Sequence, residues 1–254
     1  MGLSEIVASV TDPYERKARL WPALLAGLPI FVLVALLYAP TGDTPEKIGM
    51  LVVSCGGLYL LANICREFGK RLEPRLFEEW GGKPSTQLLR HRNSGIESVT
   101  KRRYHEFLTA KIRTNFPTAA EETSNPVAAD ETYQSAVRWL LDHTRDPTKF
   151  GLLLKENIEY GFRRNALGLK PVAIFLGVLV LAWIPFAHGQ LLQSLGHTIL
   201  GIESTQSLSV NAVVVLVVAL TMTLVWTFFF TPQRVRNAAF TYADVLLRAC
   251  DCLE

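Results

Sequence analysis

Residues 208–230 read LSVNAVVVLVVALTMTLVWTFFF and contain no Asp, Glu, Lys or Arg. A helix needs about 17 to 25 mainly apolar residues to cross a hydrocarbon core about 30 Å thick. Three more stretches have the same character, at residues 21–39, 48–64 and 172–187. The four stretches form two pairs, one on each side of a charged block. The sequence therefore predicts a polytopic membrane protein with four transmembrane helices.

The rest of the chain is polar, because 19% of all residues are charged and nearly all of them lie outside the four stretches. The first stretch follows a mixed-charge segment and has no small-residue cleavage site, so we expect a retained helix and no signal peptide. The predicted parts are an N-terminal segment (1–20), a first transmembrane hairpin (21–64), a helical domain (65–166), a second hairpin (167–231) and a C-terminal helix (232–254).

Basic residues flank the outer ends of both pairs, at 16–19, 66–71, 163–170 and 234–236. The connection inside the first pair has only Lys47, and residues 189–207 have no Lys or Arg. Loops rich in Lys and Arg stay in the cytoplasm. We therefore predict that both termini and the helical domain are cytoplasmic.

The charged block keeps helical spacing and shows no period-two alternation, so it predicts an all-α fold. Ser85 follows the turn Gly81–Pro84 and is expected to cap a helix. Residues 117–129 are expected to form a loop. Gly168 and Pro171 predict a hinge where the chain enters the third transmembrane stretch. The predicted helices cover residues 85–91, 98–116, 129–143, 150–165 and 233–253.

Charge is segregated within the block. Residues 66–116 hold twelve Lys or Arg and six Asp or Glu, whereas residues 117–146 hold six acids and two bases. The basic run has the chemistry to bind nucleotide or oligonucleotide phosphates, with a tyrosine available to stack. It is equally suited to anionic lipid headgroups or to the acidic segment. The predicted ligand-binding residues are Arg90, His91, Arg92, Lys101, Arg102, Arg103 and Tyr104.

Arg138 and His143 have the R-x4-H spacing of a family of helical ribonucleases. The pattern is short, and His143 at a predicted helix end is as well suited to capping. We expect no enzyme and keep a membrane-tethered ribonuclease as the last alternative.

The transmembrane stretches contain no ionisable residue for a proton relay, which disfavours active transport. Their small and weakly polar residues suit either helix packing or a pore wall. Four helices enclose little space, so a pore needs several copies, and we expect a homo-oligomer, most simply a tetramer. The predicted pore-lining residues are Asn63, Thr223, Thr227 and Phe230.

Aromatic, polar and basic residues gather just before the third transmembrane stretch, at Tyr160, Arg163, Arg164 and Asn165. They predict a junction that anchors the chain at the headgroups and could act in gating. Cys250 and Cys252 offer two ligands, fewer than a structural zinc site needs, so no metal or other cofactor is predicted.

The stretches GGKPSTQLLRHR (81–92) and EYGFRRN (159–165), set between two membrane hairpins, resemble the membrane effectors of bacterial anti-phage defence systems such as Hailong and Kiwa. The resemblance implies an oligomeric channel in the bacterial inner membrane, gated by a nucleotide-type ligand or a cytoplasmic partner protein. The alternative is a non-conducting scaffold in the bilayer that recruits a nucleic-acid-binding partner.

Overall fold

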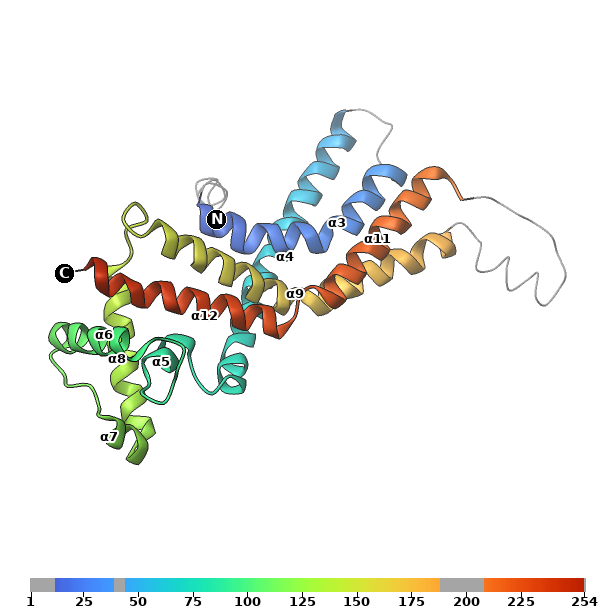
Figure 1. The fold of residues 1–254 in the computed structure, drawn as a ribbon. Coiled ribbons are helices and arrows are strands. Elements are labelled where there is room, and N and C mark those ends of the chain that lie inside the picture. Colours follow the sequence, from blue (N-terminus) through green and yellow to red (C-terminus); the bar gives the residue numbers. More distant parts are fainter. Residues whose placement is uncertain (1–11, 39–43, 188–207, 254) are drawn as a thin grey trace, which may run out of the picture. The chain divides into compact units, whose positions relative to one another are not determined.

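A computed structural model describes residues 12–38, 44–187 and 208–253, and within them the chain is helical with no strand (Figure 1). This confirms the all-α prediction. The elements are α2 (Pro13–Glu15), η1 (Arg16–Leu20), α3 (Trp21–Leu37), α4 (Thr44–Glu79), α5 (Pro84–Leu89), α6 (Ser98–Ile112), α7 (Ala119–Ser124), α8 (Pro126–His143), α9 (Gly151–Ala187), α11 (Val210–Phe228), α12 (Pro232–Arg248) and η2 (Ala249–Cys252).

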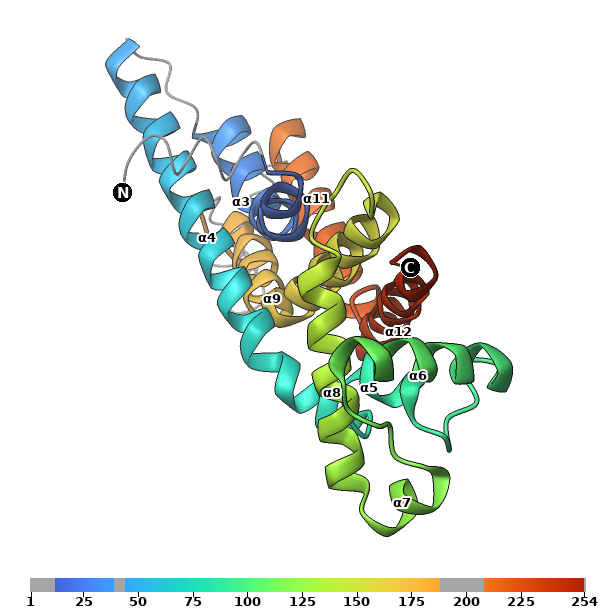
Figure 2. The ribbon, with the colours of Figure 1, turned by 90° about the vertical axis from the view of Figure 1, so that its left-hand side faces the viewer.

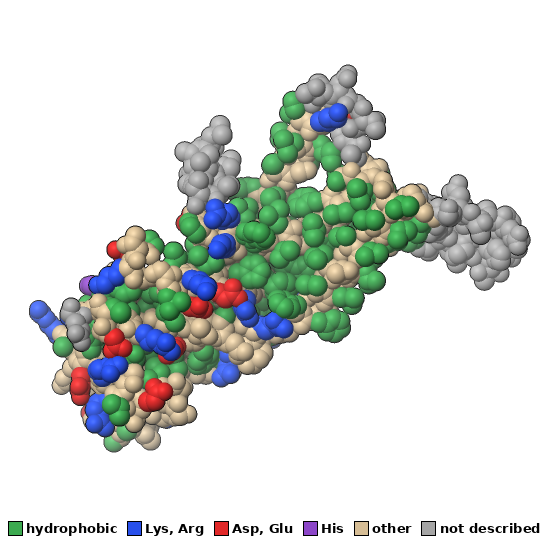
Figure 3. All heavy atoms as spheres, turned by 45° about the horizontal axis from the view of Figure 1, so that its top comes forward, with side chains coloured by type: hydrophobic (Ala, Val, Ile, Leu, Met, Phe, Trp, Pro, Cys, Tyr) green, Lys and Arg blue, Asp and Glu red, His purple; other side chains and the backbone are tan. Residues whose placement is uncertain are grey.

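Four helices among the described residues are long and apolar enough to cross a bilayer, and they contain α3, α4, α9 and α11. The chain divides into two compact units. We call residues 1–70 and 164–231 the apolar unit, and residues 71–163 and 232–254 the charged unit. Hydrophobic side chains cover the apolar helices, whereas charged side chains gather over the charged unit (Figure 3).

Within the apolar unit, α3 and α11 lie side by side (Figure 1). Ala212 and Ala219 of α11 are buried in a cluster with residues of α3 and α9. Small residues let helices approach closely, which matters in lipid because packing, and not the hydrophobic effect, holds helices together there. The buried cluster between α3, α9 and α11 consists of Leu33, Val180, Ile184, Ala212, Val215 and Ala219.

Within the charged unit, α5, α8 and α12 pack against one another (Figure 2). The helices α8 and α12 are amphipathic, and their apolar faces meet residues from α5, α6 and the start of α9. The largest buried side chains of this core include Leu89, Leu108, Tyr133, Leu140, Leu246 and Leu247.

A Schellman motif ends α4, and four residues separate α4 from α5. The N–H of Gly82 donates to the Phe77 carbonyl at 2.7 Å, and that of Gly81 donates to the Glu78 carbonyl at 3.0 Å. Gly81 has a φ of +82°, which glycine adopts without strain. The predicted turn is confirmed, but the cap is not: α5 begins at Pro84, and Lys83 occupies the N-cap position ahead of Ser85.

Two other segments differ from the sequence prediction. The expected loop contains α7, whose start Thr118 forms a reciprocal capping box with Glu121. The expected hinge is absent, because α9 continues without a break through Gly168 and Pro171 to Ala187. Residues 188–207, which belong to the predicted connection of the second hairpin, lie outside the described residues.

Candidate functional site

Arg90 is the most strongly held of the predicted ligand residues. Its guanidinium forms a bidentate pair with Asp130 of α8, with Nε to Oδ1 at 2.8 Å and Nη2 to Oδ2 at 2.6 Å. Its Nη1 donates to the Gly81 carbonyl at 2.9 Å. The hydrogen bonds that Arg90 donates to Asp130 raise the pKa of Arg90. Arg90 therefore joins the end of α5 to α8 and has little capacity left for a ligand.

Glu122 of α7 accepts hydrogen bonds from the backbone at His91 and Arg92, the next two predicted ligand-binding residues. Its carboxylate accepts the backbone N–H of His91 at 2.7 Å, that of Arg92 at 3.4 Å, and the Tyr133 hydroxyl at 2.7 Å. The Arg92 Nε atom lies 3.8 Å from the same carboxylate. Burial alone would raise the pKa of Glu122, but these hydrogen bonds together lower it.

Lys101 and His105 are buried donors to main-chain carbonyls. Lys101 Nζ donates to the carbonyls of Arg90, at 2.8 Å, and Asn93. His105 Nε2 lies 2.7 Å from the Leu89 carbonyl and therefore carries the proton, because a carbonyl only accepts. Burial lowers the pKa of Lys101, and it lowers the pKa of His105 to about 4.

Arg103 and Tyr104 connect α6 to η2. Arg103 Nε lies 3.0 Å from Oδ1 of Asp251, and the Tyr104 hydroxyl donates to Oδ2 of the same carboxylate at 3.3 Å. Burial, reinforced by Asp251, raises the pKa of Tyr104 to about 12. Arg102 is exposed and makes no ion pair within the described residues.

The predicted ligand residues thus divide into two groups. His91, Lys101 and Arg102 line an open basin of about 500 Å³ together with Asn93 and His105. The others are engaged by carboxylates of α7, α8 and η2. None of these carboxylates, Glu122, Asp130 and Asp251, was among the predicted site residues, although the acidic segment that holds Glu122 and Asp130 is one of the expected partners of the basic run.

No family model, curated protein or solved structure matches this chain.

The predicted pore-lining residues have different surroundings. Thr223 packs directly against Gly177 of α9, and its hydroxyl donates to the Ala219 carbonyl at 2.7 Å. Phe230 is buried against Trp226, with ring centroids 4.4 Å apart. These two residues pack inside the protomer. Thr227 and Asn63 are exposed.

Two of the junction residues lie in the charged unit. The Tyr160 hydroxyl donates to Glu73 Oε1 at 2.6 Å. Arg163 pairs with Glu159 one turn earlier in α9, at 2.5 Å. The first contact joins α9 to the end of α4, and the second lies within α9.

The other two junction residues lie in the apolar unit. Asn165 is fully buried, and its Nδ2 donates to the Ala18 carbonyl at 2.8 Å. Arg164 is buried beside it and donates to its Oδ1 at 3.2 Å. Asn165 therefore ties α9 to η1, and Arg164 donates to the side chain that makes this contact.

Arg138 and His143 lie on α8 in different surroundings, Arg138 beside a cleft and His143 against Trp139. They are five residues apart on α8, which separates them by about 140° around an ideal helix. His143 stacks on Trp139 at 3.9 Å and bonds its carbonyl. Within the described residues, no group of three or more His, Cys, Asp or Glu could hold a metal ion.

Proposed function

We propose that this protein is the subunit of an oligomeric membrane channel, most simply a tetramer, gated through its charged unit by a nucleotide-type ligand or a partner protein. The four apolar helices support the membrane part of this proposal. Between residues 46 and 60 most of the surface of α4 is exposed, and one face of it supports assembly and carries the proposal.

This face, which we call the α4 seam, consists of Gly49, Val53, Gly56, Leu60 and Asn63. The positions alternate in steps of four and three, which is the period that keeps one helix face against a partner helix. Val53 is 75% exposed and Leu60 is 62% exposed. A Cβ atom added at Gly49 or Gly56 would meet nothing within 4 Å. No described helix of the same protomer covers the seam.

The seam has the chemistry of a helix contact and not of a lipid-facing surface. Glycines lower helix propensity and gain nothing from lipid, but they let two helices approach closely. The Asn63 amide donates once, to the Tyr59 carbonyl at 3.1 Å, and its oxygen accepts no hydrogen bond from the described residues. A polar group in hydrocarbon is stabilised by a partner on a neighbouring helix. A second copy of α4 fills the space beside Gly49 and Gly56 and supplies a hydrogen-bond partner for the Asn63 amide.

Ion flux from liposomes that contain the purified chain tests the proposal, with particle mass measured in detergent. Gly56→Leu fills the space at the seam and Asn63→Leu removes the amide. We expect either change to shift the particle toward the monomer and to lower flux at least tenfold. Val217→Leu is the matched control, since it enlarges an exposed side chain on α11, which is not part of the seam.

A monomeric particle, or one whose mass is unchanged by both seam variants, contradicts assembly through α4. An oligomer that conducts no ions with or without nucleotides contradicts the channel and favours the non-conducting scaffold.

We also propose that the protein lies in a bacterial inner membrane with its charged unit in the cytoplasm. The basic flanks support this orientation. The resemblance to Hailong and Kiwa subunits supports a role in anti-phage defence. Depolarisation of phage-infected cells that express the chain is the expected result. An unchanged membrane potential in those cells contradicts this role.

A further inference from the structure

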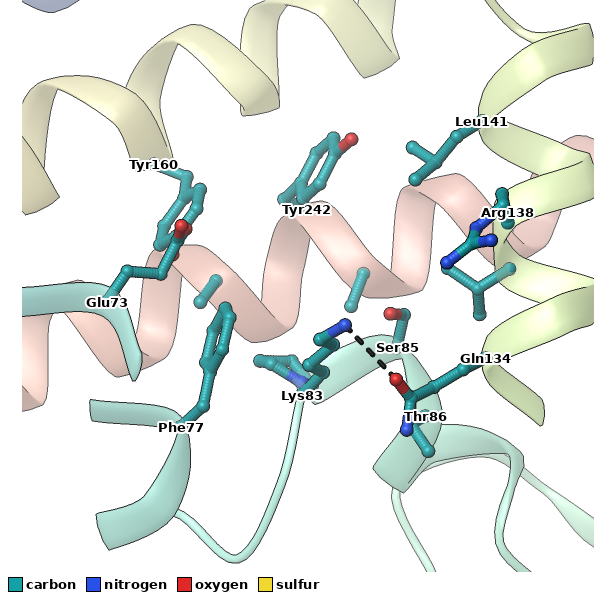
Figure 4. A pocket seen from close by; sticks show the side chains of 14 residues that line it. Glu73, Phe77, Lys83, Ser85, Thr86, Gln134, Arg138, Leu141, Tyr160 and Tyr242 are labelled. Carbon is teal, nitrogen blue, oxygen red and sulfur yellow. Dashed lines mark hydrogen bonds between the residues drawn. The ribbon is translucent and has the colours of Figure 1, made fainter. Parts of the chain in front are cut away.

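A cleft of about 230 Å³ opens in the charged unit between the end of α4 and helices α5, α8, α9 and α12 (Figure 4). None of the seven ligand-binding residues predicted from the sequence lines it. The lining residues that matter here are Phe77, Lys83, Thr86, Arg138, Tyr160 and Tyr242.

One side of the cleft presents two cations that have no carboxylate partner within the described residues. Lys83 Nζ donates to the neutral Gln134 side chain at 3.1 Å. Arg138 extends from α8 toward the cleft and makes no ion pair there (Figure 4). A guanidinium and an ammonium are the side chains that bind phosphate and carboxylate groups most strongly.

A buried hydroxyl in the same wall lacks a partner. Thr86 is 1% exposed, and its Oγ1 atom makes no hydrogen bond within the described chain. An unpaired buried donor destabilises the free protein, and a ligand oxygen that accepts from it removes this penalty. Thr86 therefore points to a ligand with an acceptor group.

Aromatic rings form another part of the lining. The rings of Tyr160 and Tyr242 are nearly parallel, at 6° with centroids 6.2 Å apart, and Phe77 lies nearby (Figure 4). The hydrogen bond from the Tyr160 hydroxyl to Glu73 holds that ring in place. Aromatic walls favour a planar apolar group on the ligand.

We propose that this cleft binds a small planar anion, an aromatic or heteroaromatic ring that carries one phosphate or carboxylate. Its ring lies against Tyr160 and Tyr242, and its oxyanion meets Lys83, Arg138 and Thr86. Ligand pockets usually have about 300 to 1,000 Å³, so a cleft of about 230 Å³ suits a mononucleotide-sized ligand or a smaller one. The cleft lies in the unit that we propose controls gating. Binding is measured without ion flux, so a failure to bind and a failure to conduct are distinguished.

Calorimetric titration of the full chain in detergent tests the inference with adenosine 5′-monophosphate and indole-3-carboxylate as probes. Adenosine lacks the anion and inorganic phosphate lacks the ring. We expect saturable binding of at least one probe, and binding at least tenfold weaker for adenosine and for phosphate. The two probes distinguish a phosphate ligand from a carboxylate ligand.

Arg138→Gln removes a cation from the cleft and should weaken binding about tenfold. Thr86→Val should weaken binding to a similar extent while keeping or raising the melting temperature, because it removes the unpaired hydroxyl. If Thr86 had a purely structural role, Thr86→Val would lower ligand binding and the melting temperature together. Lys149→Gln is the matched control, since it removes one exposed charge outside the cleft.

Arg102→Gln distinguishes the cleft from the basin. Binding that is lost in Arg102→Gln and retained in Arg138→Gln overturns the inference and assigns the ligand to the basin. The inference is also overturned if both probes fail to bind saturably. Binding that is weakened by neither Arg138→Gln nor Thr86→Val overturns it as well.

Discussion

The backbone of Gly168 in α9 lies directly against the backbone of Gly69 in α4. A Cβ atom at position 168 would lie 2.6 Å from the Gly69 nitrogen and 2.7 Å from the Phe68 carbonyl carbon. A Cβ atom at position 69 would collide with Asn165. Two helices can cross this closely only where neither has a side chain. The sequence interpretation of Gly168 as a hinge thus gives way to a packing role.

Gly168→Ala should force α4 and α9 apart, because the added methyl group meets backbone atoms that cannot rotate away. We expect a loss of about 1 to 3 kcal/mol in the free energy of unfolding, measured by thermal denaturation in detergent. Gly151→Ala in the same helix is the control, since a Cβ there meets nothing within 4 Å. A Gly168→Ala variant as stable as the Gly151→Ala variant contradicts the close crossing.

Arg90→Met should destabilise the charged unit, because it leaves Asp130 and the Gly81 carbonyl without their donor. Removing one partner of a largely buried pair typically costs about 3 to 5 kcal/mol. The pair is partly exposed, so we expect about 2 to 4 kcal/mol, measured by urea unfolding.

The matched control is Arg145→Met, which breaks an exposed pair with Asp142. Surface pairs contribute about 0 to 1 kcal/mol, so the control should change stability little. Equal effects of the two substitutions would show that the Arg90 pair is not structural.

The membrane helices could be predicted from the sequence because a run of apolar residues without charge has few other stable environments. The Gly81–Gly82 turn was also predictable, since two adjacent glycines permit the positive φ that ends a helix. The signals for α7 were present in Thr118 and Glu121, three residues apart, but the polar composition of the segment favoured a loop.

The proposed ligand site could not be predicted in the same way. A basic run does not show which of its charges will meet acids from elsewhere in the chain, and Arg90 and Asp130 are forty residues apart. The cleft with Arg138 depends on five elements that only the tertiary fold brings together. Arg138 stood out in the sequence only through its spacing to His143, which gives no indication of this cleft.

The stability of the charged unit should fall as the pH decreases from about 6.5 toward 4, because of His105. Burial lowers its pKa to about 4 in the folded protein, whereas an unfolded histidine titrates near about 6.5. Between these values the unfolded chain binds a proton that the folded chain does not, so stability decreases with acidity. We expect a contribution of roughly 1 to 3 kcal/mol.

His105→Gln tests this prediction, because glutamine can still donate to the Leu89 carbonyl but does not titrate. The variant should lose less stability than the natural chain between pH 7 and pH 4.5, as measured by urea unfolding at several pH values. Parallel curves for the two proteins would show that His105 is not the responsible group.

Glu122 affects the stability of the charged unit at a lower pH than His105 does, since the pKa of Glu122 is lowered in the folded protein. Its contribution is complete above the unfolded value of about 4.3 and is lost as the pH falls through the folded value. Glu122→Gln keeps the shape of the side chain but replaces one acceptor oxygen with a donor that faces Tyr133 or the backbone N–H groups. We expect a loss of about 1 to 3 kcal/mol at pH 7 and a smaller difference from the natural chain below pH 4.

Tyr133→Phe separates the two parts of this network, because it removes one donor to Glu122 and leaves the backbone N–H groups of His91 and Arg92 in place. Its effect on stability at pH 7 should be smaller than that of Glu122→Gln. If Tyr133→Phe is the more damaging change, the carboxylate serves mainly the tyrosine, and the connection from α7 to the end of α5 is not what holds the basic run in place.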